Sequence, residues 1–314
     1  MLERLKALSR EAPISVSEYV GECLYNPSLG YYSSRERERV GKGGGDFYTS
    51  SSLGGGVFAR LLEDSARNLS GGPGGEAGGF EIFELGAEPG RPLFARSSVF
   101  GPFDEIRISG NAFVISNELL DARPFDRFVF ERGGIFKTFV RFGPDGAPEV
   151  SLRAAPESEA EFLRGMFPDA EEPFVLDFSF DALALFERVC SMPWRGALVF
   201  SDYFRSCGEL LEFPRGTART YKNHEAGSDI FDSPGERDIT YSPPFEPFLN
   251  ALEAAGFAPA GCLPQSVFFM ENARGAIRKI VEESAALSDE KRALGELISP
   301  AHLGEVFRVL YAAR

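Results

Sequence analysis

The sequence Ile-Ser-Asn-Glu-Leu-Leu-Asp-Ala-Arg-Pro, residues 115–124, decides how the rest of this chain is interpreted. An apolar strand, 113–115, runs directly into Asn117, Glu118 and Asp121. In an open α/β sheet, ligands bind beyond the carboxyl ends of the strands. The stretch therefore predicts a polar cluster that grips a cationic substrate or a cofactor. The same residues also suit an ordinary helix start, with Asn117 as the cap and Glu118 in the first turn.

Composition places the chain among globular proteins and narrows its partners. It has 314 residues, of which 43% are hydrophobic and 25% charged, which is ordinary for a folded domain with a large core. The formal charge of −14 argues against nucleic acid, because phosphate contacts need a basic face. An acidic chain suits a basic protein segment or a cationic small molecule, although acidity also serves solubility alone.

Cysteines, histidines and apolar windows exclude several further classes. Four cysteines without C-x-x-C spacing indicate a reducing compartment rather than a disulfide scaffold, so we expect a cytoplasmic protein. With two histidines a histidine-rich metal site is not expected, and we predict no metal. The charged N-terminus lacks the apolar core of a secretory signal, and no window is apolar enough to span a membrane. The sequence leaves the oligomeric state open.

The first 79 residues predict a helical arm followed by a linker. Ser15 and Glu18 have the spacing of a capping box, and the apolar residues behind them fall on one helical face. Another helix is expected over 53–69. Residues 70–79 are rich in glycine, which predicts a flexible linker. We therefore expect an N-terminal helical arm and lid over 1–79 and a second domain over 80–314.

From residue 80 onward, expected strands alternate with expected helices, which predicts an α/β fold with a mainly parallel, doubly wound sheet. The near-continuous apolar run 197–203 is typical of a strand covered on both faces. Alternating runs between turn residues predict a β/α insertion at about 125–175. The remaining expected elements are strands at 80–85, 105–109, 113–116, 265–270 and 305–311, and helices at 245–255 and 283–296.

A glycine turn follows the first expected strand of this sheet. It reads Glu84-Leu-Gly86-Ala-Glu88-Pro-Gly90. Glycine at such a turn lets the backbone bend sharply and approach a ligand, and the next helix N-terminus offers free N–H groups. A plain strand-to-helix turn has the same pattern, so the turn alone does not establish a binding site.

Two loops carry polar residues that suit a binding site. The loop 41–45 contains Gly-Lys without the spacing of a Walker-type phosphate cradle, which is therefore not predicted. The residues after it, 46–50, either fold over a pocket as a lid or form a surface loop. His224, in the loop 221–224, is a candidate general base or substrate contact, although a loop histidine without a catalytic role is the commoner case.

Taken together, these residues resemble the family of the mitochondrial complex I assembly-factor methyltransferase and its bacterial relatives. Proteins of that family look like class I S-adenosyl-L-methionine (SAM) methyltransferases, and the mitochondrial member methylates protein arginine. The resemblance covers most of residues 13–256 and rests on short motifs in a fixed order. In this sequence the motifs lie at 13–19, 26–32, 45–50, 84–86, 117–124, 221–224 and 234–240.

The resemblance implies a class I, Rossmann-like α/β fold, SAM as the cofactor and a protein side chain such as arginine as the substrate. The resemblance also implies two sets of site residues. One set would line the cofactor, and the other would face the transferred methyl group and the nucleophile; both sets are named below. The implied cofactor-binding residues are Asp46, Phe47, Thr49, Glu84, Gly86 and Gly90. The implied catalytic residues are Asn117, Glu118, Asp121 and His224.

Two departures from the family pattern bear on cofactor binding. Glu88 occupies the middle position of the family's Glu-Leu-Gly-x-Gly-x-Gly turn, where a non-glycine residue at positive φ costs on the order of 1 kcal/mol. Its carboxylate would also oppose the SAM carboxylate. The second strand is expected to end at 108–111, with Asp104 and Glu105 at its beginning, so Asn111 would replace the family's acidic ribose contact.

The sequence leaves functions from different classes open. The leading hypothesis is a SAM-dependent methyltransferase that acts on a protein side chain, by analogy arginine, because carboxylates hold a guanidinium through paired hydrogen bonds. The competing hypothesis is a methyltransferase-fold binding or assembly protein with a degenerate, inactive cofactor site, which Glu88 and the short second strand favour. A small-molecule methyltransferase is a third hypothesis.

Overall fold

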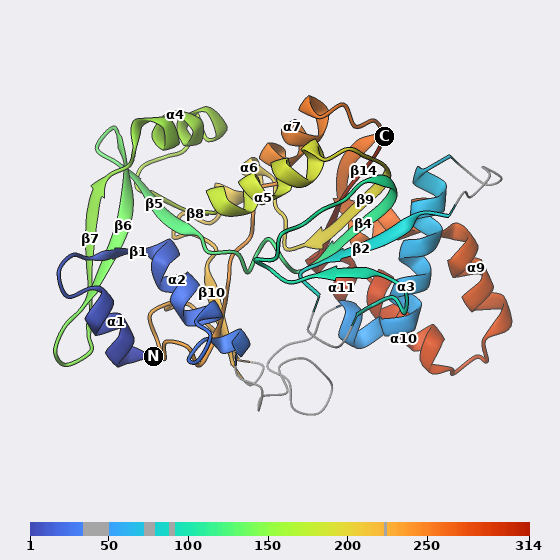
Figure 1. Ribbon diagram of the computed structural model, residues 1–314, viewed down its shortest axis with the longest axis horizontal. Coiled ribbons are helices and arrows are strands. Elements are labelled where there is room, and N and C mark those ends of the chain that lie inside the picture. The colour runs from blue at the N-terminus through green and yellow to red at the C-terminus, as the bar shows by residue number, and fades with distance from the viewer. Residues whose placement is uncertain (34–49, 72–78, 88–91, 223–224) are drawn as a thin grey trace.

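The protein is described by a computed structural model that covers residues 1–33, 50–71, 79–87, 92–222 and 225–314 (Figure 1). A central sheet with its helices occupies one half of the molecule, and a second sheet with the N-terminal helices occupies the other (Figure 1). Among the described residues, no helix combines the length and apolarity needed to cross a bilayer.

The central sheet has six strands in the order β3-β2-β4-β9-β14-β13. Its first four strands are parallel, and β14 runs antiparallel to both of its neighbours. The strands are β2 (Glu81–Leu85), β3 (Ser98–Phe100), β4 (Gly110–Asn117), β9 (Trp194–Asp202), β13 (Ala260–Pro264) and β14 (Arg308–Ala313). The chain moves from β2 to β3 on one side and then to β4 on the other, which creates a switch point between β2 and β4.

Both faces of the central sheet are covered by helices, because successive strand residues point to opposite faces. Val114 belongs to the apolar core beneath α5 (Phe180–Ser191) and α7 (Glu246–Ala254). Phe113 and Ile115 belong to the core on the opposite face. The helices on that face are α3 (Ser50–Leu69), α8 (Gln265–Asn272), α9 (Arg274–Glu283) and α10 (Asp289–Ile298). The expected doubly wound arrangement follows from this alternation.

The second sheet is antiparallel throughout, as the alternating sequence after residue 125 predicts. Its strand order is β1-β6-β5-β8, with β7 paired to β6, and α4 (Glu157–Met166) follows β7. The strands are β1 (Ile14–Ser15), β5 (Asp126–Glu131), β6 (Gly134–Phe142), β7 (Pro148–Ala154) and β8 (Phe174–Phe178).

The N-terminal arm packs between the second sheet and the later loops. It consists of α1 (Leu2–Leu8), α2 (Val16–Tyr25) and the short 3-10 turn η1 (Tyr31–Ser33). The expected capping box is present at the start of α2, where the Ser15 hydroxyl and the Glu18 carboxylate satisfy each other's backbone N–H. Buried arm residues share one core with Phe125, Phe142 and Tyr241. The division of the chain at 79/80 stays a prediction.

A small third sheet borders the carboxyl ends of the central strands. It is formed by β10 (Arg219–Lys222), β11 (Glu225–Gly227) and β12 (Asp238–Thr240), in the order β11-β10-β12. Two four-residue helices, α6 (Cys207–Leu210) and α11 (Leu303–Val306), complete this end of the molecule.

Two expected strands were wrong. Residues 105–109 form no strand, and the second strand of the sheet is β3, earlier in the chain. Ile106 and Ile108 are buried, so their alternation reports burial without strand pairing. Residues 265–270 lie within helix α8, where Gln265, Ser266, Phe268 and Phe269 are buried with helical spacing.

Candidate active site

The polar stretch that opened the sequence lies at the switch point of the central sheet. Asn117 is the last residue of β4 and is aligned with Ser201 of β9, so the two strands deliver Glu118 and Asp202 side by side. No helix begins at Asn117; residues 118–123 form turns and bends. The alternative interpretation as a helix start is therefore wrong, and the carboxyl-end interpretation holds.

Backbone geometry turns Glu118 out of the strand. Its φ is +54°, in the left-handed region, and its N–H donates to the Ser201 carbonyl oxygen at 2.9 Å. A non-glycine residue in this region costs about 1–2 kcal/mol, and such strain concentrates at functional sites. The Ser50 backbone, at the start of α3, hydrogen-bonds the Glu118 carboxylate. The positive end of that helix therefore faces this carboxylate.

Asp121 and Asp202 form the centre of the site. The Asp202 carboxylate accepts hydrogen bonds from the N–H groups of Leu120 at 2.9 Å and Tyr203 at 2.8 Å. The Asp121 Oδ2 atom accepts one from the Thr240 hydroxyl at 2.7 Å. Asp121 Oδ1 is buried and accepts no hydrogen bond from the described part of the chain. The Asp121 and Asp202 carboxyl groups lie within hydrogen-bonding reach of each other, which adds to the effect of burial and raises the pKa of Asp121. The Oδ1 atom of Asp121 is left to accept a hydrogen bond from a ligand.

Four carboxylates, Glu118, Asp121, Asp202 and Asp238, make up what we call the acidic cluster. Burial is the largest cause that raises the pKa of each of them. The charge of Asp121 further raises the pKa of Glu118, and the charge of Asp202 further raises that of Asp121. The pKa of Asp202 rises to about 6 and that of Asp238 to about 7. A cation bound here would relieve this repulsion.

Neighbouring groups position the acidic cluster and partly offset its charge. The Tyr32 hydroxyl of the arm donates to Asp238 Oδ1 at 2.8 Å, and this bond lowers the Asp238 pKa against the effect of burial. The positive charge of Arg219 in β10 also lowers the pKa of both Asp121 and Asp238. The cluster therefore depends on segments far apart in the sequence.

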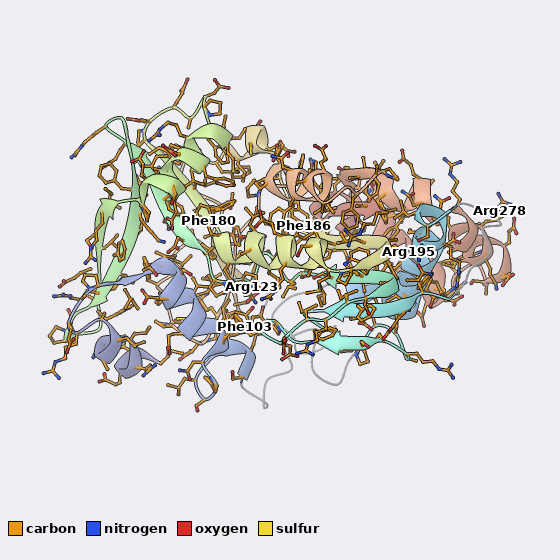
Figure 2. The ribbon with its side chains drawn as sticks, turned by 45° about the horizontal axis from the view of Figure 1, so that its top comes forward. Phe103, Arg123, Phe180, Phe186, Arg195 and Arg278 are labelled. Carbon is orange, nitrogen blue, oxygen red and sulfur yellow. The ribbon has the colours of Figure 1, made fainter. Side chains whose placement is uncertain are left out.

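Arg123 fixes the stretch that carries Glu118 and Asp121. Its guanidinium is buried and donates from Nε to Asp181 of α5 at 2.6 Å. It also lies over the Phe103 ring, 4.3 Å from the ring centroid, and Figure 2 shows the two side chains together. A guanidinium held by a carboxylate and an aromatic face loses most of its freedom. The loop after β4 is thereby tied to α5 and to the segment after β3.

The glycine turn after β2 approaches the same place. Gly86 has a φ of +77°, and its N–H donates to the Phe100 carbonyl oxygen at 2.8 Å. A Cβ atom added to Gly86 would lie 2.8 Å from the Leu119 side chain. Only glycine satisfies both conditions, since a side chain would be strained and would overlap its neighbour. The turn therefore passes directly beside the residue that follows Glu118.

Glu84 is engaged within the protein. Its carboxylate accepts hydrogen bonds from the N–H groups of Leu93 at 2.7 Å and Phe94 at 2.9 Å, and from the Ser97 hydroxyl. With these three donors its role is to hold the segment after the glycine turn. Direct contact of Glu84 with the methionine end of a cofactor stays a prediction.

The expectation for Asn111 was wrong in its placement. Asn111 lies at the beginning of β4, where it is aligned with Arg195 of β9, so it is at the opposite edge from Asn117. The cause is the misplaced second strand, which is β3 and ends at Phe100. Asp104 follows that carboxyl end and accepts a hydrogen bond from the Gly101 N–H at 2.6 Å. The acidic residue beyond the second strand is therefore Asp104.

Several predicted site residues lie outside the described part of the chain. They are Asp46, Phe47, Thr49, Glu88, Gly90 and His224. Their roles stay predictions.

The sequence interpretation missed Asp202 and Arg219, and left Asp238 and Thr240 without a role. Asp202 has the same signal as Asn117, namely a polar residue that follows an apolar run and a serine, here 197–201. That signal would have identified it.

The sheet, its switch point and the polar carboxyl edge define an α/β methyltransferase fold. The model of a family described as "Putative S-adenosyl-L-methionine-dependent methyltransferase" matches residues 98–263, and the chain belongs to this family. The cofactor of the family is SAM.

Two solved structures from Burkholderia thailandensis are similar over the whole chain. One is a "likely methyl transferase" crystallised with S-adenosyl-homocysteine; it is 26% identical to this chain, with a TM-score of 0.84, and the match covers 100% of this chain and 91% of that one. The other, an uncharacterized protein of the same superfamily, is 25% identical, with a TM-score of 0.80 over 100% and 91% of the two chains. No curated protein sequence matches this chain.

The described residues fit SAM at the switch point. Gly86 allows close approach of a ligand, and Asn117 Oδ1 is buried without a hydrogen-bond partner in the described residues. An ammonium group such as that of the SAM methionine supplies the missing donor. Asp104 offers a carboxylate at the position where dinucleotide-binding sheets contact ribose hydroxyls. These are the residues that would hold the cofactor.

Proposed function

We propose that this chain transfers a methyl group from SAM to an arginine side chain of a protein. The observation that carries the proposal is the unpartnered, buried Asp121 Oδ1 atom within the acidic cluster. A guanidinium presents five N–H donors in a planar fork, and carboxylates bind it through paired, charge-assisted hydrogen bonds. Arginine keeps its charge in any such site, since its pKa is above about 12.

In this reaction the protein has two tasks, which are to orient the two reactants and to accept a proton. Bound SAM supplies a methyl carbon attached to a positively charged sulfur. Glu118 and Asp121 would orient the guanidinium nitrogen in line with that carbon. As the N–C bond forms and the S–C bond breaks, one carboxylate accepts the proton that the nitrogen loses. A raised pKa makes Glu118 the stronger base once it is ionised.

We also propose that the fold is the class I, Rossmann-like variant, with only two described strands, β2 and β3, on one side of β4. The strand order reverses between β2 and β4, as in doubly wound nucleotide-binding sheets. The mitochondrial complex I assembly-factor family supplies the analogy for arginine, through the motifs that contain Asn117, Glu118 and Asp121. A basic segment of a partner protein would complement the net charge of −14.

Two measurements on the purified protein test the proposal. Calorimetric titration with SAM and with S-adenosyl-homocysteine should show binding, which an inactive protein with a degenerate cofactor site would lack. Incubation with SAM and basic proteins or peptides, followed by mass spectrometry, should then place the methyl group on arginine. Matched peptides with lysine in place of arginine are the control. Methylation of the lysine peptides alone would refute the arginine assignment.

A further inference from the structure

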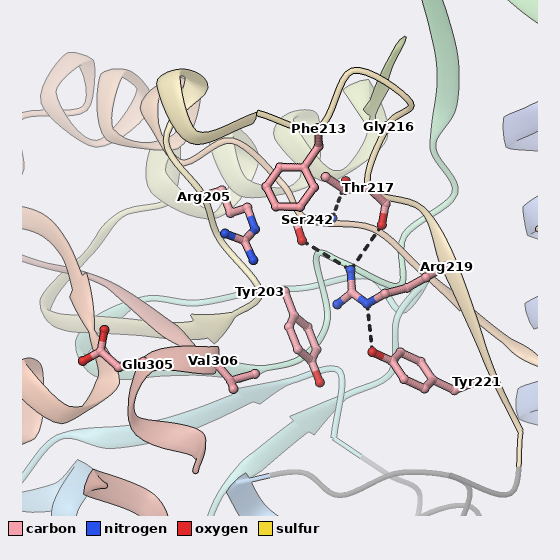
Figure 3. Close-up of a pocket in the computed structure, with 10 residues that line it drawn as sticks. All are labelled: Tyr203, Arg205, Phe213, Gly216, Thr217, Arg219, Tyr221, Ser242, Glu305 and Val306. Carbon is pink, nitrogen blue, oxygen red and sulfur yellow. Dashed lines mark hydrogen bonds between the residues drawn. The ribbon is translucent and has the colours of Figure 1, made fainter. Parts of the chain in front are cut away.

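A cavity of about 540 Å³ lies next to the acidic cluster and has the opposite electrostatic character (Figure 3). Cavities of this size accommodate a side chain with its adjoining backbone. Tyr203, which directly follows Asp202, forms one wall, and Phe213 and Tyr221 are the other aromatic residues. Arg205 and Arg219 supply two guanidinium groups, and the remaining lining includes the hydroxyls of Thr217 and Ser242. The lining also has one carboxylate, Glu305, which accepts a hydrogen bond from the Ser266 hydroxyl at 2.9 Å, so the two guanidinium groups outnumber it.

Arg205 is presented rigidly and is available for a ligand. The backbone of Arg205 is held on both sides: its backbone N–H donates to the Pro243 carbonyl oxygen at 3.0 Å, and its backbone carbonyl accepts from the Phe245 N–H at 2.9 Å. The guanidinium lies 4.8 Å from the centroid of the Phe213 ring. Among the described residues, no carboxylate forms an ion pair with it; the nearby Glu209 pairs instead with Arg308 at 2.6 Å. Arg205 is therefore a cation without an ion pair among the described residues, although its charge also acts on Glu209 and lowers the pKa of that carboxyl.

Arg219 provides the second cation, from a different strand. Its Nε donates to the Tyr221 hydroxyl at 2.9 Å and its Nη1 to Ser242 Oγ at 3.3 Å, while the guanidinium lies over the Tyr203 ring at 4.6 Å. These hydrogen-bond partners are neutral, and the charge of Asp121 in the acidic cluster also acts on this guanidinium. Figure 3 shows both guanidinium groups turned toward the space between Phe213 and Tyr203. Two like charges facing one space favour an anion between them.

We infer that this cavity binds an acidic side chain of the acceptor protein, close to the arginine that is methylated. This inference rests on the proposed function. The acidic cluster and the cavity adjoin through Asp202 and Tyr203, so a chain crossing both would meet negative and then positive groups. Each residue of an extended chain advances at most about 3.6 Å. Because Asp202 and Tyr203 are consecutive, we place the acidic residue within about three positions of the target arginine, with its carboxylate accepting paired hydrogen bonds from Arg205 and Arg219.

Peptide pairs test the inference directly. Each pair carries one arginine and either glutamate or glutamine at one of the three positions before or after it. We expect the preferred glutamate peptide to have a kcat/KM about tenfold or more above its glutamine partner, as for a hydrogen bond to a charged group. Arg205→Gln should reduce this ratio toward one, and Arg205→Glu should shift the preference to a lysine neighbour.

The control variant is Arg195→Gln, an exposed arginine at the opposite edge of β9 (Figure 2), which should keep the wild-type ratio. Fluorescence anisotropy of the same labelled peptides, with S-adenosyl-homocysteine present, gives a second readout that needs no turnover. Methylation with no glutamate preference at any position would overturn the inference and leave the proposed function standing. Absent methylation with an Arg205-dependent preference in binding would overturn the arginine assignment and leave standing only that the cavity binds an acidic side chain. Absent methylation with no preference in binding would overturn both.

Discussion

Asp121 is the residue on which the proposed chemistry depends most directly. One of its carboxylate oxygens is held by Thr240, and the other faces no donor in the described chain. Replacing Asp121 with asparagine keeps the shape and removes the charge. Because the raised pKa values of the cluster come mainly from burial, the loss of one charge does not undermine the fold.

Asp121→Asn and Glu118→Gln should each lower kcat/KM for methyl transfer by about 10²–10⁴-fold, the range of a lost acid–base group. Initial rates with a fixed arginine peptide measure the effect, and circular dichroism confirms that the fold is kept. Glu253→Gln, at an exposed position on α7, is the matched control and should leave the rate unchanged. Full activity of either cluster variant would remove that residue from the site.

Stability should depend on pH through Asp238. The folded carboxyl keeps its proton up to a pH of about 7, because burial raises its pKa, whereas an unfolded aspartate releases its proton near about 3.9. The folded state therefore binds the extra proton between these values, and the free energy of unfolding falls as pH rises from about 4 to about 7. Integrated over the shift, the fall is up to about 4 kcal/mol.

Asp238→Asn should remove this contribution, since an amide does not titrate and its oxygen still accepts the Tyr32 hydroxyl bond. Urea unfolding at pH 5 and at pH 8 measures it: the wild type should lose more stability between the two values than the variant. An identical loss in both proteins would mean that Asp238 is already ionised at pH 5.

What the sequence predicts at this scale depends on how local the signal is. Asn117, Glu118 and Asp121 follow one strand, so their shared location was predictable from a short window. Asp238 lies near Asp121 and accepts a hydrogen bond from Tyr32, which stands 206 positions earlier in the chain. No local pattern records such a pairing, because it depends on how the arm and the third sheet pack.

At the scale of elements, the glycine turn after β2 makes the sharpest prediction. Gly86→Ala should destabilise the protein by about 1–2 kcal/mol from the positive φ and by about 1–3 kcal/mol more from overlap with Leu119. It should also weaken SAM binding if the cofactor lies against this turn, as we propose. Thermal unfolding and calorimetric titration with SAM measure the two effects.

Gly110→Ala separates the cost of the positive φ from the cost of overlap with a neighbouring side chain. Gly110 has nearly the same φ, +74°, but an added Cβ atom would have no neighbour within 4 Å. It lies at the start of β4, far from the carboxyl edge. Its variant should show the backbone strain alone, with SAM affinity intact. Equal effects of the two substitutions on SAM affinity would argue against the placement of the cofactor at Gly86.

Element boundaries show where sequence patterns are ambiguous. The apolar alternation at 105–109 looks like a strand, but the strand that pairs with β2 is β3, which has only three residues, 98–100. So short a strand has little periodicity of its own and is recognised only by its partner. Because the second strand was placed too late in the sequence, the ribose contact was assigned to Asn111 and Asp104 was passed over. Long elements such as α3 and β9 were predictable because their periodicity extends over many residues.

At the scale of the whole molecule, Asp177 joins the second sheet to the cavity. This β8 carboxylate is buried; it accepts from Arg127 Nε at 2.8 Å and from the N–H groups of Thr217 and Ala218 at 2.8 Å and 2.7 Å. Asp177→Ala leaves a largely buried guanidinium and two N–H groups without their acceptor. We expect a loss of about 3–5 kcal/mol in the free energy of unfolding, as for a broken buried pair.

Urea unfolding measures this loss, and Asp177→Asn is the matched variant because it keeps an acceptor oxygen and removes the charge. Asp177→Asn should lose less stability than Asp177→Ala. Since Thr217 lines the cavity, Asp177→Ala should also lower the kcat/KM ratio between the glutamate and glutamine peptides. Unchanged stability of Asp177→Ala would show that Arg127 finds another partner.

The position of β14 has a consequence for how the protein is made. This strand, Arg308–Ala313, lies between β9 and β13 and pairs with both, although it is the last of the three to be synthesised. At about 5–20 residues per second, translation leaves β9 without this neighbour for several seconds after its own synthesis. The central sheet therefore stays incomplete until β14 has been synthesised, and until then the open edges of β9 and β13 are surfaces for a chaperone to protect.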